Sequence, residues 1–340
     1  MAKRGRWKKI AGITLLVIIA LLAVGITATI GWRPIIGARK RALRDRKFER
    51  TPERMARGKY LVESVAGCFG CHSPADAGLP GAPAKHGAEG SGVSWADAGV
   101  PWLVAPNITP DAETGAGNWT DDQLARAIRE GIGHDGRVLF PIMPYQNYRQ
   151  MSDEDLASVI VYLRSIPPVR NQLAQTQIPF PLNRLLQSVP QPIESQVAQP
   201  DVSTPAKRGQ YLTTMSSCAD CHTPMDERGQ RLPGMDFAGG FVQKGPAGEV
   251  ASANITPDAS GISYYDEALF LDVIHMGNVK ARKLNPLMPW VFYRNMTDDD
   301  LKSIFAYLRT VKPVKHLVDN TEPPTPCKLC HNRHGYGERN

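Results

Sequence analysis

The segment Cys68-Phe69-Gly70-Cys71-His72 recurs as Cys218-Ala219-Asp220-Cys221-His222 and again as Cys327-Lys328-Leu329-Cys330-His331. These segments contain all six cysteines of the 340-residue chain, so none is left for a separate structural disulfide. Cys-x-x-Cys-His is typical of covalent c-type haem attachment. Two thiols on one helical turn can form thioethers with the haem vinyl groups, and the adjacent imidazole can bind the iron. A thioredoxin-like redox pair would need a strand–helix context, which the sequence does not indicate.

The first two segments belong to an internal duplication with an offset of about 150 residues. Further blocks recur in the same order and start at Arg57 and Arg208, Leu79 and Leu232, Asn107 and Asn254, and Pro141 and Pro286. We therefore expect two copies of one domain. The predicted organisation is a membrane anchor and basic segment (1–50), domain 1 (51–170), a Pro/Gln-rich linker (171–203), domain 2 (204–316) and a tail with the third motif (317–340).

The apolar pattern of both copies predicts helices. Near the end of each copy, apolar residues fall at i, i+3, i+4 and i+7, from Leu156 and from Leu301. Ser152 and Thr297 are suited to cap these helices, and Thr120 with Gln123 forms a capping box before another helix. No segment shows sustained period-two alternation, so we expect an all-α fold of tandem helical domains with long loops.

Residues 51–316 resemble two class I cytochrome c domains, as in dihaem cytochromes and in the cytochrome subunits of membrane-bound alcohol dehydrogenases. The features that carry this resemblance are the Gly-x-Tyr helix, Cys-x-x-Cys-His, Asn-Ile-Thr-Pro-Asp, Pro-x-Met-Pro and the closing Tyr-Leu-Arg helix. The resemblance implies that Met143 and Met288 are the distal iron ligands opposite His72 and His222. His/Met ligation raises the reduction potential and suits electron carriage.

Other recurring residues allow more than one interpretation. Met151 and Met296 also recur and are rival ligands, although a packing role before the closing helices explains them. The resemblance places Asn107 and Asn254 near a haem propionate, whereas an Asx-turn is the alternative. Each proline two residues after the motif histidine could offer a carbonyl to that imidazole, or could simply form a turn.

The third motif stands on a short tail without a domain or a following methionine. We expect haem c on Cys327 and Cys330 with His331 as the proximal ligand, because attachment machinery reads the short motif itself. Its distal ligand would be His316, a partner side chain or nothing. The alternative is a structural zinc site that uses Cys327, Cys330 and either His334 or His331, with a fourth ligand from elsewhere.

The N-terminal residues indicate a membrane anchor. Residues 10–30 carry no charged side chain and follow five basic residues, which suits an uncleaved span. Residues 1–50 hold 13 Lys and Arg against two acids, whereas residues 51–340 hold 27 against 31. The net charge of +7 therefore describes the N-terminus, and nucleic-acid binding is not expected. The basic residues after the span, at positions 39–50, suggest a solvated helix or a face on anionic lipid.

These basic residues conflict with the topology that the haem motifs require. The positive-inside rule would place the body in the cytoplasm, whereas haem attachment occurs outside it. We give the motifs precedence and expect an inner-membrane protein with its haem domains in the periplasm.

The sequence therefore predicts a tethered electron-transfer cytochrome that is not an enzyme. Expected partners are a donor dehydrogenase or quinol-oxidising complex and an acceptor oxidase, reaction centre or soluble cytochrome. Two alternatives remain: a haem subunit integral to a larger redox complex, and a dihaem peroxidase. A peroxidase would need one iron with an open distal position, against which the duplicated Met143 and Met288 argue.

Overall fold

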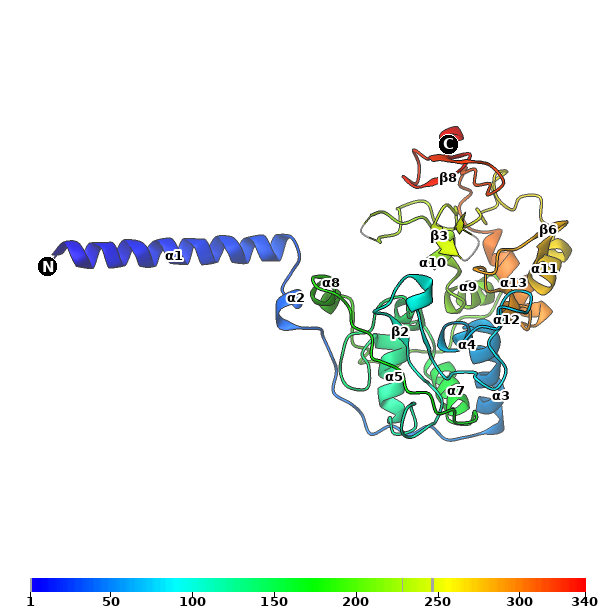
Figure 1. Ribbon diagram of the computed structural model, residues 1–340, viewed down its shortest axis with the longest axis horizontal. Coiled ribbons are helices and arrows are strands. Elements are labelled where there is room, and N and C mark those ends of the chain that lie inside the picture. Colours follow the sequence, from blue (N-terminus) through cyan, green and yellow to red (C-terminus); the bar gives the residue numbers. More distant parts are fainter. Residues whose placement is uncertain (1, 228, 246–247) are drawn as a thin grey trace.

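The computed structural model describes residues 2–227, 229–245 and 248–340. Helix α1 (Ala2–Ala28) projects away from the body of the molecule (Figure 1). Its segment Arg6–Ala28 is long and apolar enough to cross a membrane, and it is not covered by the rest of the chain. A short helix, α2 (Arg33–Ile36), follows it.

The two copies fold into helical domains of the same design. Domain 1 contains α3 (Pro52–Tyr60), η1 (Leu61–Val65), α4 (Cys68–His72), β1 (Val93–Ser94), η2 (Ala96–Ala98), β2 (Val104–Ala105), α5 (Asp121–Glu130), α6 (Tyr145–Tyr148) and α7 (Asp153–Leu163). Domain 2 contains α9 (Pro205–Met215), α10 (Cys218–His222), β3 (Val242–Gly245), β4 (Gly248–Ala251), α11 (Glu267–Met276), β5 (Asn278–Val279), β6 (Arg282–Lys283), α12 (Trp290–Tyr293) and α13 (Asp298–Leu308).

The expected caps are present. The Ser152 side chain accepts a hydrogen bond from the Asp155 amide at the start of α7, and Thr297 does the same for Asp300 at the start of α13. Thr120 and Gln123 form the predicted capping box of α5. Each cap satisfies amide groups that a helix start would otherwise leave unpaired.

The recurring Gly-x-Tyr is explained by helix packing. In domain 1, α3 crosses α7 so closely that a Cβ on Gly58 would lie 2.0 Å from the Ser158 carbonyl oxygen. In domain 2, a Cβ on Gly209 would lie 1.8 Å from the Ser303 carbonyl oxygen. Only glycine permits these crossings.

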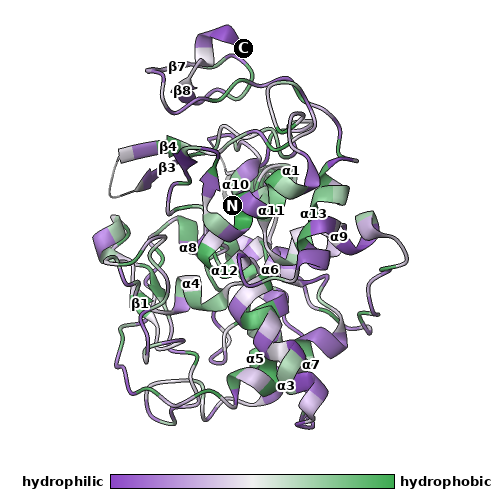
Figure 2. Cartoon of the chain, turned by 90° about the vertical axis from the view of Figure 1, so that its right-hand side faces the viewer, coloured by the Kyte–Doolittle hydropathy of each residue, from purple (hydrophilic) through white to green (hydrophobic). Residues whose placement is uncertain are grey.

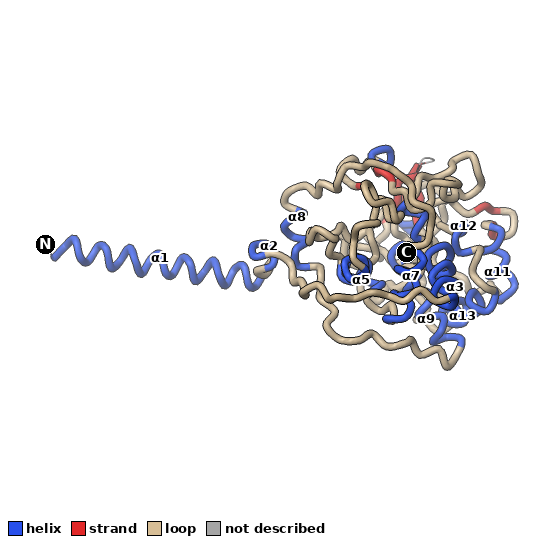
Figure 3. The backbone as a smooth tube through the Cα atoms, turned by 90° about the horizontal axis from the view of Figure 1, so that it is seen from below, coloured by secondary structure: helices blue, strands red, loops and turns tan. Residues whose placement is uncertain are grey.

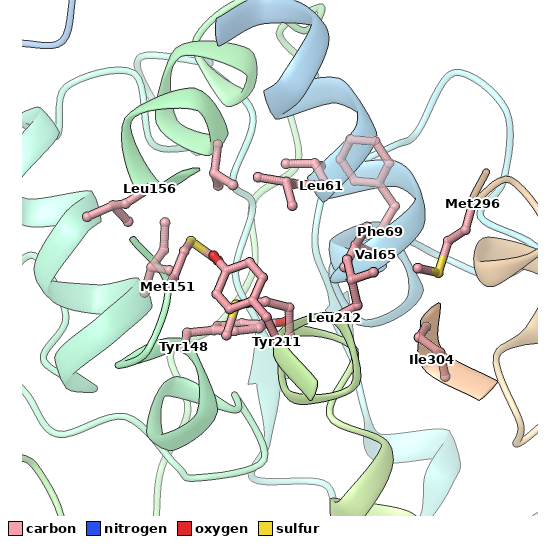
Figure 4. Packing of buried hydrophobic residues seen from close by; sticks show 14 of the residues in the cluster. Leu61, Val65, Phe69, Tyr148, Met151, Leu156, Tyr211, Leu212, Met296 and Ile304 are labelled. Carbon is pink, nitrogen blue, oxygen red and sulfur yellow. The ribbon is translucent and has the colours of Figure 1, made fainter. Parts of the chain in front are cut away.

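A single apolar cluster runs through both domains. It includes Leu61, Val65 and Leu156 of domain 1 and Leu212 and Ile304 of domain 2, each at most 6% exposed (Figure 4). Because the two domains share this core, they pack as one body rather than as units that the linker alone connects.

The all-α expectation holds for these cores and is wrong for the loops. The described residues form four two-stranded antiparallel sheets: β1–β2, β3–β4, β5–β6 and β7–β8. They lie within the long loops that surround the helices (Figure 3). The strands have two to four residues, too few for a period-two pattern to be recognised.

The linker lies against domain 1 and contains α8 (Leu182–Leu185) and η3 (Leu186–Ser188). The Thr176 hydroxyl pairs with the backbone of Val104, and the Asp153 amide donates to the Val197 carbonyl. Hydrogen bonds from both side-chain and backbone groups therefore hold this segment against domain 1.

Residues 39–50 form neither the solvated helix nor the lipid-facing helix that the sequence suggested. They run as an extended strap along α5. Arg41 binds the buried carboxylates of Asp122 (2.6 Å) and Glu130 (2.8 Å), and the Phe48 amide donates to Asp121. The strap thus pairs several basic groups with acids of domain 1, which explains a positive cluster on what we expect to be the outer side of the membrane.

The tail contains β7 (Pro324–Pro326), β8 (Arg333–Gly335) and η4 (Gly337–Arg339). It lies at the end of the body next to β3–β4 (Figure 2). The side chain of Asn320 forms hydrogen bonds with both the amide and the carbonyl of Ala251 on β4. The tail is therefore docked on domain 2.

Candidate functional site

The first Cys-x-x-Cys-His forms a single helical turn, α4. Gly67 precedes it in the left-handed conformation (φ +54°) and separates this turn from η1. Cys68 and Cys71 are unlinked and lie one turn apart. His72 Nδ1 lies 2.9 Å from the Pro106 carbonyl oxygen, so a neutral ring donates there and keeps Nε2 available to a metal.

The second motif repeats this arrangement on α10. Ser217 takes the left-handed position (φ +55°), and His222 Nδ1 lies 2.8 Å from the Ala253 carbonyl oxygen. The suggestion that a proline two residues after each histidine supplies this carbonyl is wrong. The acceptors are Pro106 and Ala253, which lie more than 30 residues downstream of the histidines.

Asn107 and Asn254 shape the turns that present those carbonyls. Asn107 is 2% exposed; its Oδ1 accepts from the Thr109 amide and hydroxyl, and its Nδ2 donates to Val169 (2.7 Å). Asn254 makes the same set of bonds with Thr256 and Val314. The structure therefore favours the Asx-turn interpretation over direct contact with a haem propionate.

The environment of the thiols fits haem attachment better than thiol redox chemistry. Burial raises the pKa of Cys68 to about 12, and the neighbouring Cys71 adds to the rise. Burial likewise raises the pKa of Cys218 to about 12. Redox-active cysteines need a lowered pKa, because the thiolate is the reactive form. Burial also lowers the pKa of His72 and His222, which keeps both rings in the neutral form that ligates iron.

The two pairs of methionines occupy different environments. Met143 and Met288 are half-buried and lie just before α6 and α12, at the edge of the core. Met151 and Met296 are 1% and 3% exposed, inside the apolar cluster (Figure 4). The core position gives the second pair a packing role, whereas the first pair remains available to a cofactor.

The two motifs lie close together across the domain interface. Asn147 of α6 donates to Asp220, inside the second motif, over 2.8 Å. From the other side, the Phe292 ring of α12 covers the first motif, because a Cβ on Gly70 would lie 3.0 Å from that ring. The short helix that follows the candidate methionine ligand in each domain, α6 or α12, therefore contacts the Cys-x-x-Cys-His turn of the other domain. The sequence could not indicate this pairing, because no local pattern marks it.

The third motif does not repeat this design. Cys327 and Cys330 lie in the turn after β7 rather than on a helix, and His331 is exposed. Instead, both cysteines meet His316 and His334, with all four side chains buried. The arrangement needed for the expected third haem, with His331 as proximal ligand, is therefore not seen.

Comparison with known proteins matches the geometry. The cytochrome c family model matches residues 55–167 and 206–312. The fructose dehydrogenase cytochrome subunit of Gluconobacter japonicus is 30% identical over 276 residues, 76% of this chain and 52% of that protein. A diheme cytochrome c-type protein of Cereibacter sphaeroides is 28% identical over 74% of this chain and 84% of its own length.

A third relative matches a shorter region. A nicotinate dehydrogenase subunit of Pseudomonas putida is 36% identical over 164 residues, 46% of this chain and 14% of that protein. The chain thus spans about half the length, or less, of several relatives that it matches.

Proposed function

Because the chain belongs to the cytochrome c family and carries covalently bound haem c in both domains, we propose that it transfers single electrons between its haems and redox proteins at a membrane. Haem supplies an iron that takes up and releases one electron at a time. The observation that carries the proposal is the close approach of the two Cys-x-x-Cys-His turns across the domain interface.

Each domain contains the residues needed to hold one haem. Cys68 and Cys71 would anchor the first, and His72 and Met143 would bind its iron. The corresponding residues of domain 2 are Cys218, Cys221, His222 and Met288. The Pro106 and Ala253 carbonyls hold the histidines in the tautomer that leaves Nε2 available to the iron.

The domain interface would support electron transfer between the haems. Tyr148 of domain 1 donates to the Ala66 carbonyl, and Tyr293 of domain 2 donates to the Ser216 carbonyl, each just before a motif. Burial raises the pKa of both tyrosines well above the ordinary value, with contributions from the nearby cysteines of both motifs. Both tyrosines are therefore neutral, and they lie near the cysteines of the two motifs.

The chain would be anchored by α1, with its body on the periplasmic side of the inner membrane. Haem attachment outside the cytoplasm and the pairing of Arg41 with Asp122 and Glu130 support this orientation. The donors would be dehydrogenases or quinol-oxidising complexes, and the acceptors an oxidase, a reaction centre or a soluble cytochrome. The names of the relatives, several of which are cytochrome subunits of dehydrogenases, favour a dehydrogenase partner.

The test is purification of the full chain from native membranes in mild detergent, followed by redox titration of its haem bands. The proposal expects two low-spin haems that titrate reversibly, together with a co-purifying dehydrogenase that reduces them when given its substrate. High-spin bands with rapid peroxide turnover would instead identify a peroxidase. Reversible haems without a co-purifying protein would favour a free carrier.

A further inference from the structure

The tail contains a cluster of four potential metal ligands. His316, Cys327, Cys330 and His334 are each at most 4% exposed, and their ligand atoms all lie within 4.8 Å of one another. We propose that these residues bind a structural zinc ion that fastens the tail to domain 2.

The distances fit a tetrahedral site. Cys327 Sγ lies 3.4 Å from His316 Nε2, and Cys330 Sγ lies 3.3 Å from His334 Nε2. Zinc bound to sulfur at about 2.3 Å and to nitrogen at about 2.0 Å holds such atoms about 3.5 Å apart at tetrahedral angles. Two thiolates and two imidazoles in this geometry are a preferred zinc ligand set.

Both imidazoles are oriented as metal ligands usually are. His316 Nδ1 lies 2.8 Å from the Ala238 carbonyl oxygen, and His334 Nδ1 lies 3.0 Å from the Gly335 carbonyl oxygen. A neutral ring that donates through Nδ1 presents an unprotonated Nε2, which is the nitrogen that faces the sulfur atoms in both cases.

The local fold brings the ligands together from two segments. Cys327 follows β7, and His331 reverses the chain in the left-handed conformation (φ +60°), so that His334 returns on β8. His316 comes from the segment after α13. The β7–β8 hairpin therefore supplies three ligands, and the end of domain 2 supplies the fourth.

The site also contacts the loop that supports the second haem motif. Gly240 packs directly on the cluster, since a Cβ there would lie 2.5 Å from His316 Cε1 and 3.4 Å from Cys330 Sγ. The adjacent Gly239 donates its amide to the His222 carbonyl over 2.7 Å. A metal ion would thus hold the tail and this loop together.

The tail needs a metal ion or a covalent link to stabilise it, because it has little apolar core of its own. After Leu308, the buried apolar side chains in the described residues are the two cysteines Cys327 and Cys330. A segment with so little apolar burial commonly depends on a metal or a disulfide for its structure. Four buried polar ligands around one point favour the metal.

A haem at this motif would require a different arrangement. His331, the ligand that the motif would provide, is exposed, whereas both thiols contact the imidazoles of His316 and His334. A porphyrin bonded to both sulfur atoms would have to separate these contacts and detach the hairpin from domain 2. The zinc alternative is therefore the one that the described residues support.

Counting haem and metal in the full-length, detergent-purified protein separates the two cofactors. We expect two haems per chain from the pyridine haemochrome spectrum and one zinc by mass spectrometry of the metal content. Three haems per chain, a C-terminal peptide with the mass of attached haem, or a Cys327–Cys330 disulfide without zinc would each overturn the proposal.

Single variants identify the ligands. His316→Ala and His334→Ala should each lower the zinc content several-fold while two haems per chain remain. His331→Ala is the matched control, because it changes a histidine of the same motif outside the cluster; it should retain both zinc and haem. Loss of a haem in His331→Ala would instead support attachment at the third motif. If a ligand variant does not accumulate, the metal and haem counts of the unaltered protein still decide between the two cofactors.

Discussion

The hydroxyl group of Tyr211 in domain 2 donates a hydrogen bond to the carboxylate of Asp155 in domain 1 over 2.7 Å. The same carboxylate receives two bonds from Arg57 of its own domain. The duplicated positions repeat the contact in reverse, since Tyr60 of domain 1 donates to Asp300 of domain 2. The Gly-x-Tyr helix of each domain therefore contacts the closing helix of the other, and the duplication produces a nearly symmetric interface.

We expect Tyr211→Phe to lower the free energy of unfolding by about 1 kcal/mol, because a buried hydrogen bond across the interface is lost while Arg57 still pairs with Asp155. Urea unfolding, followed by haem absorbance, measures the change. Tyr264→Phe, at a residue that is 56% exposed, is the control and should change the midpoint far less. Equal effects of the two variants would count against the interface bond.

Met143→Ala and Met288→Ala should each leave two haems attached, lower the potential of one haem and permit carbon monoxide binding, because the soft thioether that stabilises ferrous iron is removed. Met151→Ala and Met296→Ala are matched controls. They should destabilise the core by about 2 to 5 kcal/mol while the optical spectrum is retained. Spectral changes in the control variants alone would transfer the ligand role to them.

Stability should fall at low pH as the strap detaches. Burial would raise the pKa of Asp122, but hydrogen bonds from Arg41 and the Arg44 amide outweigh it and lower the pKa below the ordinary 3.8. Because the folded-state pKa is depressed, the contribution is fully present above about pH 4 and is lost as the pH falls through the lower folded-state value. Unfolding measured from pH 6 to pH 2 should show a steeper loss than in Asp122→Asn.

Asp122→Asn should also detach the strap at neutral pH, as protonation of Asp122 does at low pH. The strap contains Arg44 and Lys47, so trypsin should cleave the variant there several-fold faster than it cleaves the unaltered chain. Asp97→Asn, at an exposed acid, is the control and should be cleaved at the ordinary rate. Protection of the strap in Asp122→Asn would show that the carboxylate does not hold it.

Gly58→Ala should destabilise domain 1 by at least about 2 kcal/mol, because its Cβ would lie 2.0 Å from the Ser158 carbonyl oxygen and force α3 and α7 apart. Thermal unfolding of the haem-loaded protein measures this. Gly78→Ala is the comparison, since its Cβ would meet the Asp76 carboxylate at 3.3 Å and little else. Similar melting temperatures for the two variants would contradict the close crossing.

Local patterns predicted the parts of the fold that depend on neighbours in sequence. The caps at Ser152, Thr297 and Thr120 follow from residue types within one helical turn, and the structure confirms them. The Cys-x-x-Cys-His turns likewise need no distant contact. The haem attachment sites could therefore be predicted from the chain alone.

The features that sequence reasoning missed depend on distant partners. Arg41 and Asp122 are 81 residues apart, and His72 meets the Pro106 carbonyl after 34 residues. Contacts between residues so far apart in the chain leave no periodic pattern in the sequence. At the tail a signal was present, because His334 lies four residues after Cys330 and His316 lies eleven before Cys327. The zinc alternative drawn from the sequence does include His334, but the sequence suggests His316 only as a possible distal haem ligand, because the contact of His316 with Cys327 depends on how the tail folds back.

Under the proposed anchoring by α1, the docked strap limits how far the body can travel from the membrane. Between α1 and the strap, Arg184 of the linker donates to the Ile35 carbonyl, and the Ala38 amide donates to Gln187. The chain from residue 33 onward is therefore attached to the body, which leaves residues 29–32 as the pivot. Such a molecule cannot act as a long swinging arm. With α1 in the bilayer as proposed, its haems would stay close to the membrane surface, and encounters with membrane partners would become a two-dimensional search in the plane of the bilayer.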